Sequence, residues 1–372
     1  MKYRNIIITA STVILVAIAA VVFYACNKEN LKDNLLSTTK AAKMSSELQD
    51  LYKQMPAVDY GNIKVINGDI LQFESKEHYK KVVEQLTQQY EKWSTLFLDK
   101  YDVKITEDEL DNIQNKLGFS DCIPMIKFEE KLGIYGKNLR YIQRKIEDDW
   151  LDKGAIGTPL TDKVIIDPAE QTLLNQYREA CIGDTICQVR EDASILIPVR
   201  YASELPTIRE MSTEALAKDK RFQAIIKAII LPITCYNDKW YKGDHKEHPS
   251  NEKKFWWEFE FKYSWFFGCS EGVSEMHNYK KNNKGKWVND WAICALGQSY
   301  KVYYSLDYYA CKDLGTRGCG LQTPHKFISR SIRSSYVNPD NKRNRIDPAN
   351  SKTHCRHNGW TFTFNVGTGA EM

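Results

Sequence analysis

Hydrophobic and polar residues alternate in the second half of the chain, as they do in β-strands. Every odd-numbered residue from 255 to 267 is aromatic, and charged residues such as Glu258 and Lys262 lie between them. A period of two places the aromatic side chains on one face of a long strand. The same period recurs at residues 300–306 and 360–366. We therefore expect an antiparallel β-sandwich or open barrel.

The first half shows a helical period instead. Apolar residues between 79 and 97 recur at spacings of three and four, which predicts a long helix with Ser75 as its cap. A second helix is expected to begin at Thr106, which can form a capping box with Glu109, and to end at Gly118.

Turn signals predict two short hairpins within this helical part. Asn67-Gly68 separates two β-prone runs and is typical of a type I′ turn. Gly183-Asp184 turns a second hairpin between Cys181 and Cys187. With a three-residue loop these cysteines would face each other and could form a disulfide, whereas with a two-residue loop they would not. A short helix is expected after Asp167.

These patterns predict the α+β class. A mostly helical N-terminal domain with a small β-hairpin is expected at residues 46–200, followed by an antiparallel β-sandwich-like C-terminal domain at residues 201–372. A chain of 372 residues is long enough for two such domains. Residues 1–25 are assigned to a signal peptide, and residues 26–45 to a lipidated cysteine and a polar tether.

The first residues are organised like a bacterial export signal. Lys2 and Arg4 precede an uncharged, mostly apolar run at residues 6–25, and Cys26 follows Ala25 directly. We expect cleavage before Cys26, a lipid on its thiol and anchoring in the membrane. The alternative is that the run stays uncleaved as a transmembrane anchor, for which it is long enough.

The residues that follow carry a family resemblance. Cys26-Asn27-Lys28-Glu29 resembles the surface-export signal of Bacteroidota lipoproteins. The body is similar to surface lipoproteins of unknown function from these bacteria in its Asn67-Gly68 hairpin, in Leu173-Leu174-Asn175 and in the Ile-Gly-Asp-Thr-Ile run at 182–186. The resemblance implies an outer-membrane lipoprotein that faces either the cell surface or the periplasm.

Composition and charge limit the function further. The formal net charge is only +4, and nucleic acid is not an expected partner of an exported chain. Ten cysteines leave nine after lipidation of Cys26, so at least one thiol lacks a partner within the chain. Export favours disulfides among the others.

The chain contains no common catalytic motif, such as a Gly-x-Ser-x-Gly elbow, a His-Glu-x-x-His helix or a phosphate-binding glycine loop. We assign neither catalytic residues nor a cofactor. The metal-binding candidates are Asp244, His245, Glu247 and His248, with His354, Cys355 and His357 as distant partners. Because residues 244–248 read as a polar loop, we expect them to be solvated and assign no metal. A thiol nucleophile could combine an unpaired cysteine with His277, His325 or His354, but disulfides are the favoured fate.

The aromatic stripe could form a core or an exposed platform for sugar rings, and we favour the core. Trp256 and Phe266, on the opposite face, are then the candidates for exposed ligand contact. Basic residues at 342–345, with Arg330 and Arg333, could bind phosphate or acidic glycans, although a solvated loop is the favoured interpretation.

Together these features predict a membrane-anchored cell-envelope lipoprotein without enzymatic activity, whose partner is a glycan or another surface protein. The alternative is an envelope enzyme that acts on glycans or proteins.

Replacement of the anchoring cysteine tests the first of these expectations. Cys26→Ala should abolish incorporation of a labelled fatty acid and leave a precursor of higher mass, because no other thiol can accept the lipid at the cleavage site. Cys122→Ala serves as the control and should be labelled and processed normally. Undiminished labelling of Cys26→Ala would contradict the assignment.

Overall fold

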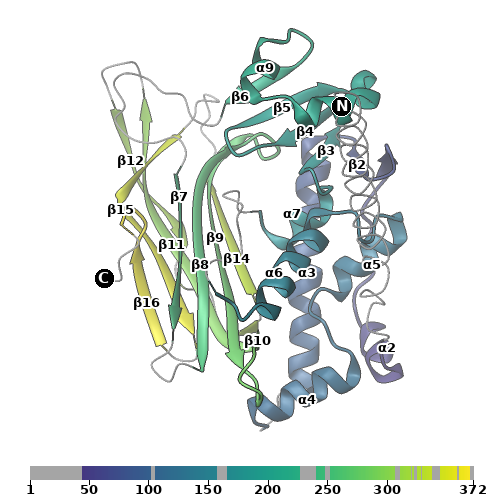
Figure 1. Cartoon of the computed structure of the whole chain (residues 1–372), viewed down its shortest axis with the longest axis vertical. Coiled ribbons are helices and arrows are strands. Elements are labelled where there is room, and N and C mark those ends of the chain that lie inside the picture. The colour runs from purple at the N-terminus through teal and green to yellow at the C-terminus, as the bar shows by residue number, and fades with distance from the viewer. Residues whose placement is uncertain are drawn as a thin grey trace, which may run out of the picture. The chain divides into compact units, whose positions relative to one another are not determined.

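The computed structural model describes residues 44–101, 105–156, 166–226, 240–247, 252–305, 311–319, 321, 325–327, 329–336, 344–357 and 360–368 (Figure 1). The expected signal peptide and Cys26 lie outside these residues. Within the described ranges, no helix combines the length and the apolar character needed to cross a bilayer. Residues 54–111 and 121–372 form one compact unit.

The helices begin and end where local signals place them. Ser75 Oγ accepts from the amide of His78 at 3.1 Å, as expected for a cap. Thr106 and Glu109 form both bonds of the capping box, at 2.8 and 3.3 Å. The α-helices are α2 (Ser46–Tyr52), α3 (Lys76–Tyr101), α4 (Glu107–Leu117), α5 (Ile123–Leu132), α6 (Leu139–Asp152), α7 (Pro168–Leu173), α8 (Leu205–Glu210) and α9 (Thr213–Lys218), and η1 (Val199–Glu204) is a 3-10 helix.

One sheet has the order β1-β2-β3-β4-β5-β6 and is antiparallel except for the β2–β3 pair. Both of its expected hairpins are present. Asn67 and Gly68 have φ angles of 52° and 80°, the left-handed region that a type I′ turn requires. The strands are β1 (Lys64–Ile66), β2 (Ile70–Phe73), β3 (Glu179–Ile182), β4 (Thr185–Val189), β5 (Ala193–Pro198) and β6 (Gln223–Ile226).

The loop length of the second hairpin determines whether Cys181 and Cys187 lie opposite each other. Ile182 pairs with Thr185, so the loop holds only two residues. Cys181 therefore lies opposite Ile186, and Cys187 lies opposite Ala180. The two thiols belong to different cores on the two sides of the sheet, one lined by α3, α5 and α7 and the other by η1, α8 and α9. The hairpin register does not pair them.

Two further sheets face each other across an aromatic core, which confirms the core interpretation of the stripe. Phe255, Trp257, Phe259 and Phe261 are buried in this core, and Trp257 stacks on Phe364 with 4.6 Å between ring centroids. One sheet has the order β10-β9-β8-β7 with β14 beside β9, and the other β12-β11-β15-β16 with β13 beside β11. The strands are β7 (Trp240–Glu247), β8 (Lys253–Ser264), β9 (Cys269–Lys281), β10 (Trp287–Asn289), β11 (Ala292–Ser305), β12 (Cys311–Cys319), β13 (His325–Phe327), β14 (Ser329–Tyr336), β15 (Asn344–His357) and β16 (Trp360–Asn365).

The expected exposure of Trp256 and Phe266 is wrong. Strand β8 ends at Ser264 rather than at 267, and a turn closed by Gly268 N and Ser264 O at 2.8 Å carries Phe266 against Tyr79 of α3. Phe266 is 1% exposed and Trp256 4% exposed. Trp256 is covered because the second face of β8 is also buried, whereas Phe266 is covered by α3.

That second face is charged, and it lies on the side of α3, α6 and α7 (Figure 1). Its buried charged residues include Glu258, Glu260, Lys262, Glu271 and Glu275. His277 lies beside them with 14% of its side chain exposed. Arg333 of β14 joins them and binds Asp167 and Glu271, each at 2.7 Å, and Glu170. Arg333 is therefore part of a buried ion-pair network, not of a solvated basic loop. The side chains of Arg330 and of residues 342–345 lie outside the description.

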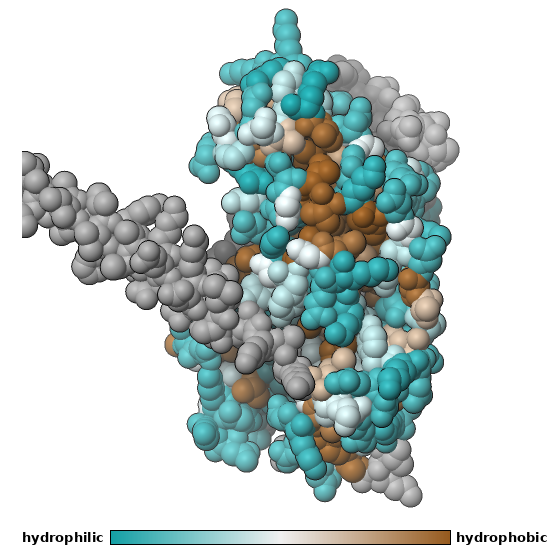
Figure 2. Space-filling model, turned by 90° about the vertical axis from the view of Figure 1, so that its right-hand side faces the viewer, coloured by the Kyte–Doolittle hydropathy of each residue, from teal (hydrophilic) through white to brown (hydrophobic). Residues whose placement is uncertain are grey.

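The surface that Figure 2 displays carries hydrophobic residues in an elongated band bordered by hydrophilic ones. Apolar atoms form more than half of the surface of ordinary folded proteins, so such a band does not by itself indicate a binding partner. Val65 of β1 is one example of an exposed hydrophobic side chain in the described part.

The aromatic core predicts a large difference between two tryptophans of the sandwich. Trp257→Ala should lower the free energy of unfolding by roughly 3–5 kcal/mol, because a fully buried indole leaves a cavity. Trp360→Ala, at a site 45% exposed, should lower it by less than about 1 kcal/mol. Urea unfolding followed by circular dichroism measures both, and equal losses would contradict the assignment of the core.

Candidate functional site

A pocket with a volume of about 300 Å³ lies between the end of α6 and strands β7, β8, β9 and β10. Its buried walls are mostly aromatic, and its polar residues come from β7 and β8. We call it the tryptophan pocket after Trp150, Trp256 and Trp287, which line it together with Tyr279, Lys254, His245 and Glu247. His245 and Glu247 are exposed, whereas Lys254, Trp256 and Tyr279 are buried, so the exposed pair marks the rim.

The end of α6 shapes one side of this pocket. Gly154 adopts a φ of 89°, and the amides of Gly154 and Ala155 bond back to Leu151 O and Trp150 O at 3.1 and 2.9 Å. This is a Schellman motif, which needs a left-handed residue after the helix. The turn presents the carbonyl of Ala155 to the ammonium of Lys254 at 2.8 Å. It thereby joins the helix to the floor of the pocket.

Two aromatic residues of the pocket wall donate hydrogen bonds to carboxylates that do not line the pocket. The indole nitrogen of Trp256 donates to Glu258, and the hydroxyl of Tyr279 donates to Glu147 at 2.8 Å. Trp150 contacts Tyr279 edge to face, with centroids 5.1 Å apart. The aromatic rings are thus fixed before any ligand arrives, which lowers the entropic cost of binding.

Lys254 is the cation of the pocket. It is 5% exposed, and its nitrogen lies 4.3 Å from the ring centroid of Trp287 and 4.7 Å from that of Trp150. Burial lowers the pKa of Lys254, and the nearby Glu247 acts in the opposite direction. The ammonium already occupies the position that a cationic ligand would take over the indole faces.

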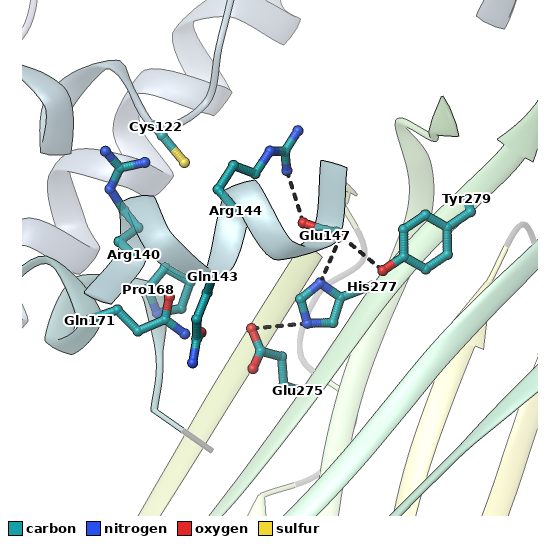
Figure 3. A pocket seen from close by; sticks show the side chains of 10 residues that line it. All are labelled: Cys122, Arg140, Gln143, Arg144, Glu147, Pro168, Gln171, Glu275, His277 and Tyr279. Atoms are coloured by element: carbon teal, nitrogen blue, oxygen red, sulfur yellow. Dashed lines mark hydrogen bonds and ion pairs between the residues drawn. The ribbon is translucent and has the colours of Figure 1, made fainter. Parts of the chain in front are cut away.

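A second pocket, of about 60 Å³, shares Tyr279 with the first. Figure 3 shows the side chains that line it. Helical spacing brings Arg140, Arg144 and Glu147 of α6 to one side, and strand alternation brings Glu275 and His277 of β9 to the other. Figure 3 shows Glu147 reaching from the helix toward both His277 and Tyr279. A volume of this size accommodates a few water molecules.

His277 lies between two carboxylates. Its ring nitrogens are 3.5 Å from Glu147 and 3.2 Å from Glu275. Burial alone would lower the pKa of His277, but these carboxylates outweigh it and raise the pKa well above its usual value. Burial would raise the pKa of Glu147, yet Arg144, at 3.2 Å, and His277 lower it to about 2. The group is therefore a charged network at neutral pH.

Glu258 completes the network from β8, where it is the register partner of Glu275. Burial and the neighbouring carboxylate of Glu275 raise the pKa of Glu258 to about 7. Tyr241 lies 3.4 Å away and Trp256 also donates to it, so Glu258 accepts hydrogen bonds from the pocket wall. A like-charge pair of this kind retains a proton that an isolated carboxyl would lose.

The thiol–histidine candidates do not form an activated pair among the described residues. Cys122 lines the same pocket as His277, but burial raises the pKa of its thiol to about 12. The imidazole of His277 is already engaged by carboxylates. His354 lies 3.2 Å from the hydroxyl of Thr363, and the side chain of His325 lies outside the description. A thiolate nucleophile would need a depressed pKa instead.

The metal candidates are dispersed. Asp244, His245 and Glu247 belong to strand β7, so the expectation of a polar loop was wrong for residues 244–247, which pair with β8. His248 lies outside the described residues. Cys355 and His357 point to the buried side of β15, whereas His354, just before Cys355, points to the other side. In the described ranges, no group of three or more His, Cys, Asp or Glu side chains is arranged to hold a metal ion.

Sequence patterns found only part of the site. Trp256 was expected as a ligand contact and does line the tryptophan pocket, whereas Phe266 lies in the helix-covered core. Trp150, Lys254 and Trp287 were missed. The one local signal for Trp150 is its position in the last turn of α6, four residues before Gly154, and nothing in the sequence links it to Lys254 or Trp287.

Comparison with known proteins adds little. No protein-family model matches the chain, and no curated protein does. The crystal structure of a DUF4848 family protein from Bacteroides thetaiotaomicron is similar at 12% identity, with 80% of this chain and 95% of that chain covered. The TM-score is 0.17, a value at which the likeness supports no conclusion about fold or function.

The raised pKa of Glu258 predicts a pH-dependent gain in stability for Glu258→Gln. Between pH 4.5 and 7 the carboxyl group of Glu258 loses its proton in the unfolded chain but keeps it in the folded protein. Rising pH therefore lowers the free energy of unfolding across this range. Glutamine does not titrate, so the variant does not lose stability as the pH rises. We expect the variant to be more stable than the native protein by roughly 3 kcal/mol at pH 8.

Urea unfolding at pH 4 and pH 8 measures this difference, which should vanish at pH 4. Glu130→Gln, at an exposed position of α5, should show no such pH dependence. A Glu258→Gln protein that is less stable than the native protein at pH 8 would argue against the raised pKa of Glu258.

Proposed function

We propose that this chain is a cell-envelope lipoprotein, held at the outer membrane by a lipid on Cys26, whose folded part binds a sugar ring of a glycan in the tryptophan pocket. The export signal in the sequence supports the location. The observation that carries the binding proposal is the convergence of three indole rings and one phenol ring on a single open pocket.

A sugar ring suits these walls chemically. The C–H faces of a pyranose are apolar and pack on indole rings, while its hydroxyl groups need hydrogen-bond partners at the edge. Trp150, Trp256 and Trp287 supply the rings, and His245 and Glu247 at the rim supply polar atoms. A volume of about 300 Å³ is at the lower end of ordinary ligand pockets and suits one or two rings.

Binding fits this pocket better than hydrolysis of a glycosidic bond. Glycosidases place two carboxyl groups on either side of the scissile bond. Glu247 is the one carboxylate that lines the tryptophan pocket in the described part of the chain. Glu147 and Glu258 lie behind the aromatic walls and are occupied by Tyr279 and Trp256. An envelope enzyme is the alternative, and it would require these walls to open.

Removal of a wall residue tests the proposal. Trp287→Ala should weaken binding of a glycan found by array screening by about tenfold or more, since it removes one stacking surface. Trp287 is half-buried at the edge of the sheet, so the fold should tolerate its loss. Titration calorimetry on the full chain in detergent gives the affinity.

Trp360→Ala is the matched control, because Trp360 is an exposed tryptophan on the other sheet. It should leave the affinity unchanged. If no glycan binds the native chain, or if both variants lose affinity equally, the proposal is wrong. Turnover of a polysaccharide by the native chain would support the enzyme instead.

A further inference from the structure

Lys254 stands out among the buried lysines of its sheet because it lacks a carboxylate partner. Lys262 lies 2.8 Å from Glu260, and Lys280 lies 3.6 Å from Asp290. Among described groups, the ammonium of Lys254 has one hydrogen bond, to the carbonyl of Ala155, and the faces of two indoles. Its charge is thus buried in the tryptophan pocket with no counter-ion from the described residues.

This arrangement is incomplete in chemical terms. An ammonium has three N–H donors, and one of them is matched here. Indole faces attract a cation but do not accept the other two hydrogen bonds with the strength of an anionic oxygen. A buried charge without a partner is costly, and an anion that entered the pocket would remove that cost.

On this basis, and resting on the proposed function, we infer that the sugar ring bound in the tryptophan pocket carries an anionic group, a carboxylate or a sulfate, which pairs with the ammonium of Lys254. The ring would stack on the indoles while the anionic group points to the floor. Lys281 adds positive charge beside the pocket, since its nitrogen lies 5.1 Å from the ring centroid of Trp287.

Glu247 is the competing group. It is the register partner of Lys254 on the neighbouring strand, but its exposed side chain lies beyond ion-pair distance in the described structure. Its negative charge at the rim opposes an incoming anion. Glu247→Gln should therefore strengthen binding of an acidic sugar, which is the opposite of the effect expected at Lys254.

The experiment compares matched charged and neutral ligands on the full chain in detergent. The probes are an oligogalacturonide and its methyl ester, and a sulfated galactan oligosaccharide and its desulfated form. Calorimetry should show that at least one charged probe binds about tenfold or more tightly than its neutral match. Which pair shows the preference identifies carboxylate or sulfate.

Substitutions at Lys254 assign that preference to the ammonium. Lys254→Met keeps the aliphatic stem and should abolish the preference, so that the charged and neutral probes of a pair bind with equal affinity. Lys254→Arg should retain it. Where Lys254→Met fails to fold by circular dichroism, a gain in acidic-probe affinity in Glu247→Gln supports the inference, and no gain overturns it.

The outcomes separate this inference from the proposed function. Equal binding of charged and neutral sugars by the native chain, or an unchanged preference in a folded Lys254→Met protein, overturns the inference and leaves glycan binding intact. A native chain that binds none of the four probes and no glycan on an array overturns both.

Discussion

Charged side chains on the helix-facing side of strands β8, β9 and β14 are buried next to groups of opposite charge, and the rest of the fold depends on this pairing. Arg333 lies 2.7 Å from Glu271, and Lys262 lies 2.8 Å from Glu260. A buried ion that loses its partner destabilises a protein by several kcal/mol. Helices α6 and α7 supply partners such as Glu147 and Asp167, so the sandwich cannot expose this face to water without leaving charges unmatched.

The charged residues between the helices and strands β8, β9 and β14, which we call the charged layer, also orient walls of the tryptophan pocket. Glu258 holds the indole of Trp256, and Glu147 holds the hydroxyl of Tyr279. The protonation of the layer and the geometry of the pocket are therefore physically linked through two hydrogen bonds. Because the pKa of Glu258 is near 7, the charge behind Trp256 changes close to neutral pH. Lys254 differs from the layer in that its partner is missing from the described part of the chain.

Features encoded by neighbouring residues could be predicted. The caps at Ser75 and Thr106, the turn at Asn67-Gly68 and the aromatic face of residues 255–261 each follow from local dihedral preferences or from a period of two. The predictions failed where distant segments meet. Strand alternation separates two faces of β8, but it does not say that helices from residues 139–173 cover the second one.

The sequence by itself determined the helix ends, the hairpins and the inward direction of the aromatic face of residues 255–261, because each depends on residues a few positions apart. Only the tertiary structure decided that Trp256 is buried, that Arg333 is paired, and that Trp150, Lys254 and Trp287 share a pocket. These outcomes depend on contacts across more than a hundred residues. No local sequence pattern predicts these contacts, because the free energy of burying a charge depends on which distant segment of the chain packs against it.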